Sequence, residues 1–415
     1  MKNKSNKQLW LSVFSLLTGS IASEVFTFAL GMYILKIYKS SFLFSMIILT
    51  GPVVSLLLSP LIGHVVDNFS HKKIVMISQS VSIIVMAIAT LLIFNWFNKY
   101  IFILLVIILS GILEACDAFQ STAYKASTTG IVVKEDQQKI IALEQGVNIV
   151  VTLLSPILGG VLYAILPIKY FFSFDLIGEI LTLLLIIPLN FQLFSTLKTA
   201  VTQKRKHILE DFKEGISFII KDKILVSLTV FSVVINLCLA SINVGVPYIL
   251  LTKLSMNTRE YGVIQALLAL GMLGASLIWS TVKLKSSLLK TTGLFGLLVT
   301  LSLILFCSPI ASRSYVGITY GIAMTILGFA IVSINMPSSI YVRTQVEEDY
   351  QGRINIFFNS TLGILTPIGT AVFGILFEKV SGTILFFVSA LIILLMSILL
   401  ITENNVTSNE VHTKF

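Results

Sequence analysis

The sequence predicts an all-α membrane protein whose twelve transmembrane helices form two six-helix halves. The chain of 415 residues is 56% hydrophobic and 12% charged, whereas a soluble domain carries about a quarter charged residues. Twelve apolar runs are long enough to cross a bilayer, which takes roughly 20 apolar residues. The longest polar interruption, 195–223, falls in the middle of the chain and leaves six runs on each side.

Each predicted span is an apolar run bounded by polar or turn-forming residues. In chain order, the spans are predicted at 9–35, 41–63, 74–95, 100–124, 140–165, 170–194, 224–252, 260–281, 289–308, 315–341, 354–377 and 382–401.

These spans define four expected parts of the chain. They are an N-terminal six-helix half at 1–194, a cytoplasmic linker at 195–223, a C-terminal six-helix half at 224–401 and a cytoplasmic tail at 402–415. The linker shows helical amphipathic periodicity, which predicts a helix lying on the membrane surface. Its apolar face consists of Ile208, Leu209, Phe212, Ile216, Ile219 and Ile220.

The two halves share a short internal sequence repeat. Residues 154–157 of the fifth span read Leu-Ser-Pro-Ile, and residues 365–368 of the eleventh read Leu-Thr-Pro-Ile. Each segment follows an acidic loop at the same place in its half. The sequence therefore predicts a duplicated architecture, in which two repeats rock around a central binding site.

The distribution of basic residues predicts that both termini are cytoplasmic. With the N-terminus inside, 21 of the 29 Lys and Arg residues fall in cytoplasmic segments and the other eight in external ones. Cytoplasmic segments of membrane proteins carry this excess and attract anionic lipid. The first apolar run is too long for a cleavable signal peptide, so we expect a multi-pass protein of the cytoplasmic membrane.

Acidic residues lie within the apolar runs of the first half, with no Lys or Arg beside them at membrane depth. An acid at this depth is costly and usually binds something, here a proton or a cationic ligand. Glu114 and Asp117 are three residues apart and share a helix face, as do Asp175 and Glu179, four apart. The six acids are Glu24, Glu114, Asp117, Glu144, Asp175 and Glu179.

A second pattern follows the second span, where Gly63 is followed by Asp67 and then by the basic pair Lys72 and Lys73. The glycine would allow close helix approach, the aspartate could accept hydrogen bonds from a helix N-terminus, and the lysines would face anionic lipid. This pattern resembles the signature loop of the major facilitator superfamily, which latches the two halves of the transporter. His71 stands where the family often has Arg, which makes the cluster pH-sensitive or weaker here.

The fifth span adds Ser155, Pro156, Gly159 and Gly160, which resemble the antiporter motif of the same family. Proline removes a backbone hydrogen bond and bends a helix, and the glycines let a neighbour pack closely. In the family this motif is associated with exporters. The alternative is a proline bend needed for packing alone.

Three further segments, at 174–177, 211–216 and 349–353, resemble the branch that includes macrolide-efflux proteins and enterobactin exporters. In this fold spans one, four, seven and ten line the cavity. The resemblance therefore implies that Glu24, Glu114 and Asp117 face cargo or protons, and it favours a structural role for Asp175 and Glu179 on the peripheral sixth span. Span four lacks the Arg of many drug–proton antiporters, so that residue's role cannot be transferred.

Glu144 and Lys125 each allow two interpretations. Glu144 is close to the cytoplasmic end of its span, where its carboxylate could be exposed to water. Lys125 could pair with Asp67 or could simply flank the membrane as a basic residue.

The resemblance and the buried acids together predict a secondary active efflux transporter. Its expected activity is proton-coupled antiport of an amphipathic drug such as a macrolide, and a cationic cargo matches the acids. Export of a siderophore or peptide product is the alternative. We expect no cofactor, no metal site, no nucleic-acid partner and no enzymatic activity, because the four His residues lie in loops or the tail and no nucleotide-binding glycine loop is present.

Overall fold

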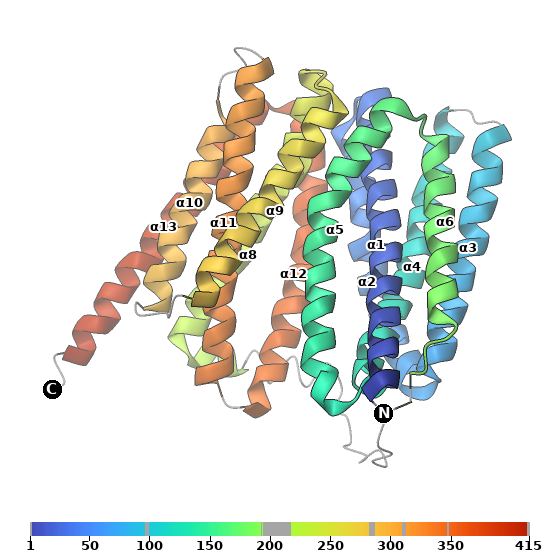
Figure 1. Ribbon diagram of the computed structural model, residues 1–415. Helices are drawn as coiled ribbons and strands as arrows, with labels where there is room; N and C mark the ends of the chain where they lie inside the picture. The colour runs from blue at the N-terminus through green and yellow to red at the C-terminus, as the bar shows by residue number, and fades with distance from the viewer. Residues whose placement is uncertain are drawn as a thin grey trace. The chain divides into compact units, whose positions relative to one another are not determined.

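The computed structural model describes residues 2–95, 99–191, 193, 217–281, 287–308, 313–346 and 348–412 (Figure 1). These residues form helices joined by short turns. The chain divides into two compact units. Unit 1 contains Met1–Lys39, Met46–Thr199 and Asn257–Gly262, and unit 2 contains Ser40–Ser45, Ala200–Met256 and Val263–Phe415.

Six long α-helices and one short 3₁₀ helix precede the central segment 194–216, which lies outside the described residues. They are α1 (Lys2–Tyr38), α2 (Ser41–Asn68), α3 (His71–Asn95), α4 (Lys99–Ile131), η1 (Lys134–Asp136), α5 (Gln137–Ile165) and α6 (Lys169–Ile186).

Six more long α-helices follow it, with a π-helical turn after the first. They are α8 (Lys223–Pro247), η2 (Tyr248–Lys253), α9 (Thr258–Thr281), α10 (Leu288–Phe306), α11 (Arg313–Gln345), α12 (Glu348–Lys379) and α13 (Gly382–His412).

The same packing pattern occurs in both units. In unit 1, α1 packs against α5 and α6, and α3 packs against α4 and α6. In unit 2, α8 packs against α12 and α13, and α10 packs against α11 and α13. The turns that follow α1 and η2 also match, since Lys39 and Ser255 both have positive φ angles, of 52° and 47°. The short sequence repeat shared by the fifth and eleventh spans therefore belongs to a structural repeat.

Several predicted boundaries differ from the observed helices, and three of these differences lie at the ends of the second, sixth and twelfth spans. The sixth span, expected at 170–194, ends as a helix at Ile186. Ile187 keeps helical backbone angles, but Pro188 has no backbone N–H to continue the hydrogen-bond ladder, and Leu189 donates to the Ile186 carbonyl oxygen instead. The second span, expected to end at 63, continues to Asn68. The last helix continues past 401 to His412, through residues expected to form a tail.

Ten of the described helices are long and apolar enough to cross a membrane. Helix α6 falls outside that set because its 18 residues include Lys169, Asp175 and Glu179. Helix α12 also falls outside that set, and the structure describes only some of its side chains. A crossing of all twelve helices therefore stays a prediction.

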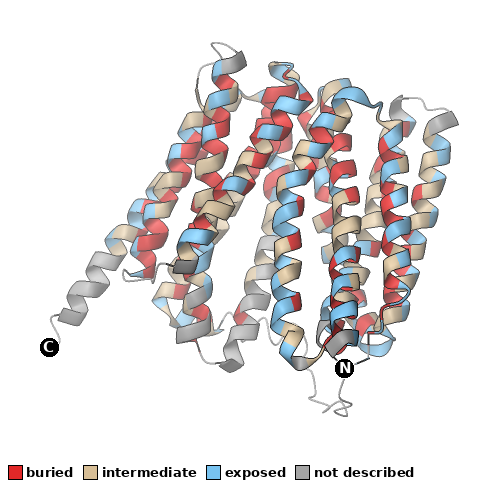
Figure 2. Cartoon of the chain, viewed as in Figure 1, coloured by how far each residue is buried: buried red, intermediate tan, exposed pale blue. Residues whose placement is uncertain are grey.

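Burial follows the helix contacts within each unit (Figure 2). In unit 1, buried apolar side chains of α1, α4 and α5, such as Leu9, Ala123 and Val151, form one core. Large apolar side chains also cover outward faces, and Leu57 and Leu91 are examples. Exposed apolar faces on long helices are what a hydrocarbon surrounding requires.

The predicted amphipathic helix lies mostly outside the described residues. Its end is described at 217–221, where the chain is helical and Ile219 packs with Leu225 and Val342 of unit 2. Asp222 then caps α8 by accepting hydrogen bonds from the backbone N–H groups of Ile224 and Leu225, at 2.9 and 3.3 Å. The expected limits of the linker, 195 and 223, stay predictions.

Candidate functional site in unit 1

Five of the predicted acids come together in unit 1. Glu24 lies on α1, Glu114 and Asp117 on α4, and Asp175 and Glu179 on α6. Asp117 is within electrostatic range of Glu24, Glu114 and Glu179, and Asp175 is within range of Asp117 and Glu179. We call these five residues the acid cluster. The pair on α6, which the family resemblance placed at the periphery in a structural role, belongs to the same electrostatic group as the acids of α1 and α4.

The members of the acid cluster differ in exposure. Glu24 and Asp117 are exposed, and Glu114 is half-buried. Asp175 and Glu179 are buried, with 1% and 8% of their surfaces exposed. The cluster therefore has an accessible part on α1 and α4 and an enclosed part on α6.

Gln79 of α3 reaches into the enclosed part. Its Nε2 donates hydrogen bonds to the Glu179 carboxylate and, at 2.9 Å, to the Glu179 carbonyl oxygen. Sequence reasoning missed this residue, although an amide in the middle of an apolar run is a signal that could have identified it. The Asp175 Oδ1 and Gln79 Oε1 atoms have no hydrogen-bond partner.

Gly51 of α2 leaves room for the Glu114 side chain. A Cβ atom at Gly51 would lie 2.7 Å from the Glu114 carboxyl group, too close for two nonbonded atoms. Gly111, one turn earlier on α4, faces Thr50. The close approach of α2 to α4 therefore holds the Glu114 carboxyl group in place.

The contact between α1 and α6 positions the α6 acids. A Cβ atom at Gly178 would overlap the Cβ atom of Ala22, so the two helices touch at this point. Next to it, the hydroxyls of Thr18 and Thr182 share a hydrogen bond of 3.1 Å. Because Gly178 precedes Glu179, this close packing fixes where the acids of α6 lie along the helix axis and how α6 is rotated about that axis.

Glu144 lies elsewhere in unit 1. It is on α5, and Lys125 and Tyr124 of α4 are within its electrostatic range. Its Oε1 atom is buried without a hydrogen-bond partner. Lys125 acts on Glu144, which gives this acid a cationic neighbour that the acid cluster lacks among the described residues.

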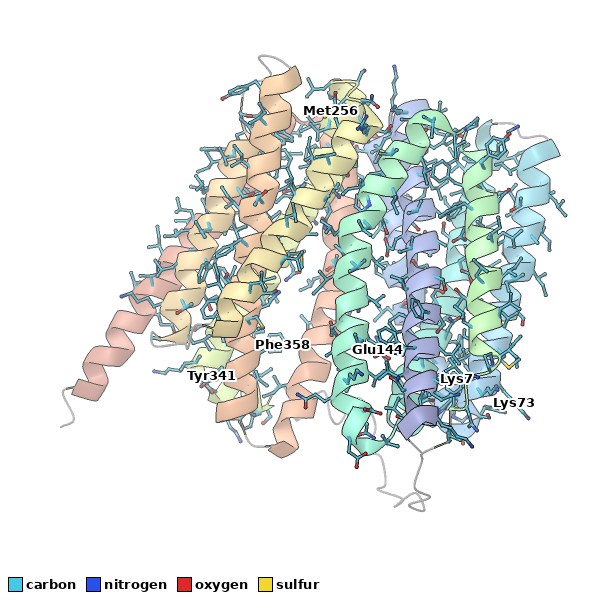
Figure 3. The ribbon with its side chains drawn as sticks, viewed as in Figure 1. Lys7, Lys73, Glu144, Met256, Tyr341 and Phe358 are labelled. Carbon is cyan, nitrogen blue, oxygen red and sulfur yellow. The ribbon has the colours of Figure 1, made fainter. Side chains whose placement is uncertain are left out.

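The signature-loop residues surround the turn between α2 and α3. Asp67 is exposed in the last turn of α2, and Lys73 is exposed at the same end of unit 1 (Figure 3). The Lys72 Nζ donates a hydrogen bond of 2.9 Å to the carbonyl oxygen of Ile187, just after α6, where a cation complements the helix dipole. Gly63 lies inside α2, and a Cβ atom there would meet no atom within 4 Å, so the expected close helix approach is wrong.

His71 links this turn to α4. Its Nδ1 lies 2.7 Å from the Ser127 Oγ, and its Nε2 lies 3.2 Å from the Val66 carbonyl oxygen. The histidine thus joins α2, α3 and α4 at the end of unit 1 that carries the N-terminus.

The antiporter-type residues make close contacts within unit 1. A Cβ atom at Gly159 would lie 2.7 Å from the Phe28 ring, and one at Gly160 would lie 2.6 Å from the Thr258 carbonyl oxygen. Gly262 in turn approaches the Pro156 carbonyl oxygen. The motif therefore brings α5 against α1 and against the first turns of α9.

Two neighbouring features complete this contact. The rings of Phe28 and Tyr261 stack with centroids 5.5 Å apart. The hydroxyl of Ser155 is buried without a hydrogen-bond partner. The residues that α5 meets, Phe28, Thr258 and Gly262, could not be identified from the motif alone.

Gly160→Ala should lower the melting temperature of the purified protein and reduce transport. The added methyl group collides with backbone on α9, and such overpacking costs about 1–3 kcal/mol. Gly146→Ala is the matched control on the same helix, because its Cβ would meet no atom within 4 Å. That control should be neutral or stabilise by about 0.5–1 kcal/mol. Equal effects of the two substitutions on melting would show that the α5–α9 contact is not tight.

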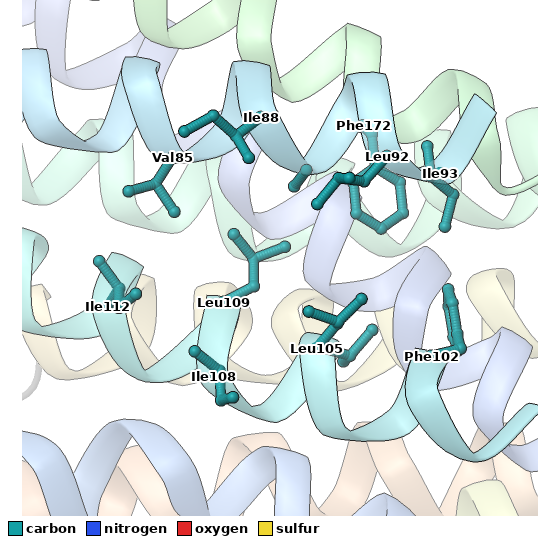
Figure 4. Close-up of a pocket in the computed structure, with 12 residues that line it drawn as sticks. Val85, Ile88, Leu92, Ile93, Phe102, Leu105, Ile108, Leu109, Ile112 and Phe172 are labelled. Atoms are coloured by element: carbon teal, nitrogen blue, oxygen red, sulfur yellow. The ribbon is translucent and has the colours of Figure 1, made fainter. Parts of the chain in front are cut away.

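An apolar groove lies between α3 and α4 (Figure 4). It has a volume of about 240 Å³. Ile88 and Leu92 of α3, Ile108 and Leu109 of α4, and Phe172 of α6 are among its lining residues. Its hydrocarbon lining suits a hydrocarbon group, and it contains none of the predicted acids.

Long apolar helices in two similarly packed units, with acids inside the apolar runs, define a polytopic membrane protein of the transporter class. The sequence model of the Major Facilitator Superfamily matches residues 10–370. The chain belongs to the major facilitator superfamily and is a multi-pass membrane transporter. This membership points to transport and not to an enzymatic reaction.

Similar proteins agree with this assignment. Macrolide efflux protein A of Streptococcus pyogenes is 20% identical over 380 residues, which cover 91% of each chain. A protein of the same name from Enterococcus faecalis is 21% identical over 312 residues, which cover 75% of this chain and 93% of that one.

Solved structures share the fold. A bacterial homologue of the iron transporter ferroportin, crystallised in an inward-facing state, matches with a TM-score of 0.74 and 13% identity, covering 96% of this chain and 98% of that one. A D-xylose–proton symporter matches with a TM-score of 0.70 and 10% identity, covering 96% and 97%.

Proposed function

We propose that the protein exports an amphipathic, cationic drug such as a macrolide across the cell membrane in exchange for protons. The observation that carries this proposal is the acid cluster. Among the described residues, the groups that act on its five carboxyls are other acids and Gln79, with no Lys or Arg. Such a cluster needs an external positive charge, which a proton or a cationic cargo supplies.

The exposure of Glu24 and Asp117 supports a binding role. An acid on a spanning helix almost always faces a water-filled cavity or the bundle interior, because facing hydrocarbon is costly. The same argument makes these two residues and the half-buried Glu114 the candidates for contact with cargo.

The cargo class follows from charge and from the relatives. The acid cluster would repel an anionic siderophore, so it supports a drug and not a siderophore as the cargo. The Streptococcus and Enterococcus relatives are named for macrolide efflux, and macrolides are amphipathic. The antiporter-type residues Ser155, Pro156, Gly159 and Gly160 support export, because in this family the motif accompanies exporters.

The mechanism is competition between cargo and protons for the accessible carboxylates, those of Glu24, Glu114 and Asp117. Cargo from the cytoplasm binds the ionised acids, and protons from outside bind them later and release the cargo. We place both termini in the cytoplasm, with Gly63, Asp67, Lys72 and Lys73 at the cytoplasmic end as the conformational latch. Lys72 would serve the latch by tying the α2–α3 turn to the end of α6.

An accumulation assay tests the function. Cells that produce the protein should accumulate less of a cationic dye and of a macrolide than cells with an empty vector. A proton uncoupler should abolish the difference, because it removes the gradient that drives exchange. Equal accumulation in both strains for every compound, at verified protein levels, would contradict the proposal.

Glu24→Gln should discriminate cargo by charge. It removes one carboxylate at nearly constant size, so efflux of a cationic dye should fall more than efflux of a neutral compound of similar size. The same accumulation assay with matched dyes measures this ratio. An equal loss for both dyes would assign Glu24 to proton coupling and not to recognition of the cation.

A further inference from the structure

The enclosed part of the acid cluster has features that cargo binding does not explain. We call Asp175 and Glu179 the α6 acid pair. Four residues separate them on one helix, so they share a face. Gln79 lies against Glu179 and is 1% exposed, as is Asp175. An amphipathic drug has no open access to groups as enclosed as these.

Two oxygen atoms at this place lack partners. Asp175 Oδ1 and Gln79 Oε1 are both buried without a hydrogen bond. An ionised carboxylate and an amide oxygen can only accept hydrogen bonds. Buried acceptors without donors are costly, so this part of the protein favours a bound group that can donate a hydrogen bond.

Among the described residues, the surrounding helices supply no cation to the pair. From α4, the groups that face it are Asp117 and the Cys116 thiol, whose own hydrogen bond is to Ser82. From α1, Glu24 acts on Asp117, and the contact with α6 is made by Thr18 and Ala22. From α3, Gln79 donates to Glu179. These described groups leave the two carboxylates with one donor between them.

Binding of a proton satisfies this arrangement. Two like charges in one enclosed site cannot both persist, and protonation converts one carboxyl oxygen into an O–H donor that an unpartnered acceptor can use. A metal ion fits less well, because the described residues contain no group of three or more His, Cys, Asp or Glu side chains that could hold one.

We propose that the α6 acid pair, together with Gln79, is a dedicated proton-binding site that exchanges its proton with Asp117. The site is separate from the accessible acids that meet cargo. The assignment of the bound proton to coupling rests on the proposed function, whereas the existence of the site does not.

Infrared spectroscopy of the purified full-length protein, without cargo, tests the site. A protonated carboxyl group has a C=O stretching band that disappears on ionisation. The wild-type protein should show such a band and lose it reversibly as the pH rises. Asp175→Asn combined with Glu179→Gln should remove the part of the band that belongs to the α6 acid pair, while Glu144→Gln, the matched control in the same unit, should keep that part. An unchanged band in the double variant would overturn the proposal.

Two further arms keep the test decisive. Gln79→Leu preserves both acids and removes the donor to ionised Glu179, so the band should persist to more alkaline pH, with melting curves as the check on folding. An identical titration in this variant would contradict the role of Gln79.

The wild-type titration should be the same in sodium and choline chloride at equal ionic strength. A sodium-dependent shift would assign the site to a metal ion and overturn the proton assignment. Because no arm uses cargo, failure here is separate from failure of the efflux assay.

Discussion

Asp117→Asn should strongly reduce gradient-driven efflux while the protein stays folded. Asp117 acts on Glu24 and Glu114 at the accessible side and on Glu179 at the enclosed side. The amide keeps the size of the side chain but cannot take up a proton, so the accessible and enclosed acids lose their link. We expect a loss of at least about ten-fold in efflux, which corresponds to about 1.4 kcal/mol.

Efflux of a dye from proteoliposomes under an imposed pH gradient measures this effect. Glu144→Gln is the control, because Glu144 has Lys125 as a neighbour and lies outside the acid cluster. It should retain efflux within about two-fold, since a peripheral acid is not required for transfer between the other acids. Efflux by Asp117→Asn at the wild-type rate would remove Asp117 from the coupling path.

Gly178→Ala should cause the largest loss of stability among the substitutions considered. The new methyl group would overlap the Cβ atom of Ala22 on α1, and both positions lie on rigid helix backbone. The helices must move apart, which costs about 1–3 kcal/mol. Separation of α1 from α6 would also move Glu179, so transport should fall together with the melting temperature.

Compensation by Ala22→Gly gives this prediction its control. The double variant Gly178→Ala with Ala22→Gly restores one methyl group at the contact, so part of the lost stability and transport should return. Melting of the single and double variants forms a double-mutant cycle, whose coupling energy should be about 0.5–3 kcal/mol. Additive losses would show that the two residues are not in contact.

Much of the fold was readable from the sequence because hydrophobic length and turn residues determine where a spanning helix can lie. The separation into two similarly packed sets of helices was indicated by the repeated Leu-Ser/Thr-Pro-Ile segments. Helix ends were less accurate. An apolar run continues past Pro188, yet α6 ends at Ile186, because hydropathy does not report that proline lacks the backbone N–H that would continue a helix.

The acids were identifiable one by one, but their grouping was not. Sequence gives the depth of Asp175 on its helix, and the i, i+4 spacing gives its relation to Glu179. It does not give the rotation of α6 against α1, which depends on the contact between Gly178 and Ala22. The same reason explains why Gln79 was missed.

Glycines show the same limit. Gly63 and Gly160 look alike in a motif, but a side chain at Gly63 would meet open space and one at Gly160 would meet the Thr258 backbone. Close approach is a property of the partner helix, which a single sequence does not specify.

Exchange of a proton for cargo is the central claim, and one measurement tests it most directly. Proteoliposomes would enclose a pH-sensitive dye, with no pH gradient and with the membrane potential clamped. A quaternary ammonium cargo, which cannot carry a proton itself, would be added outside. We expect the lumen to become alkaline as cargo enters and protons leave, and we expect no change with Asp117→Asn. Entry of labelled cargo into wild-type proteoliposomes without any change in lumenal pH would contradict proton exchange.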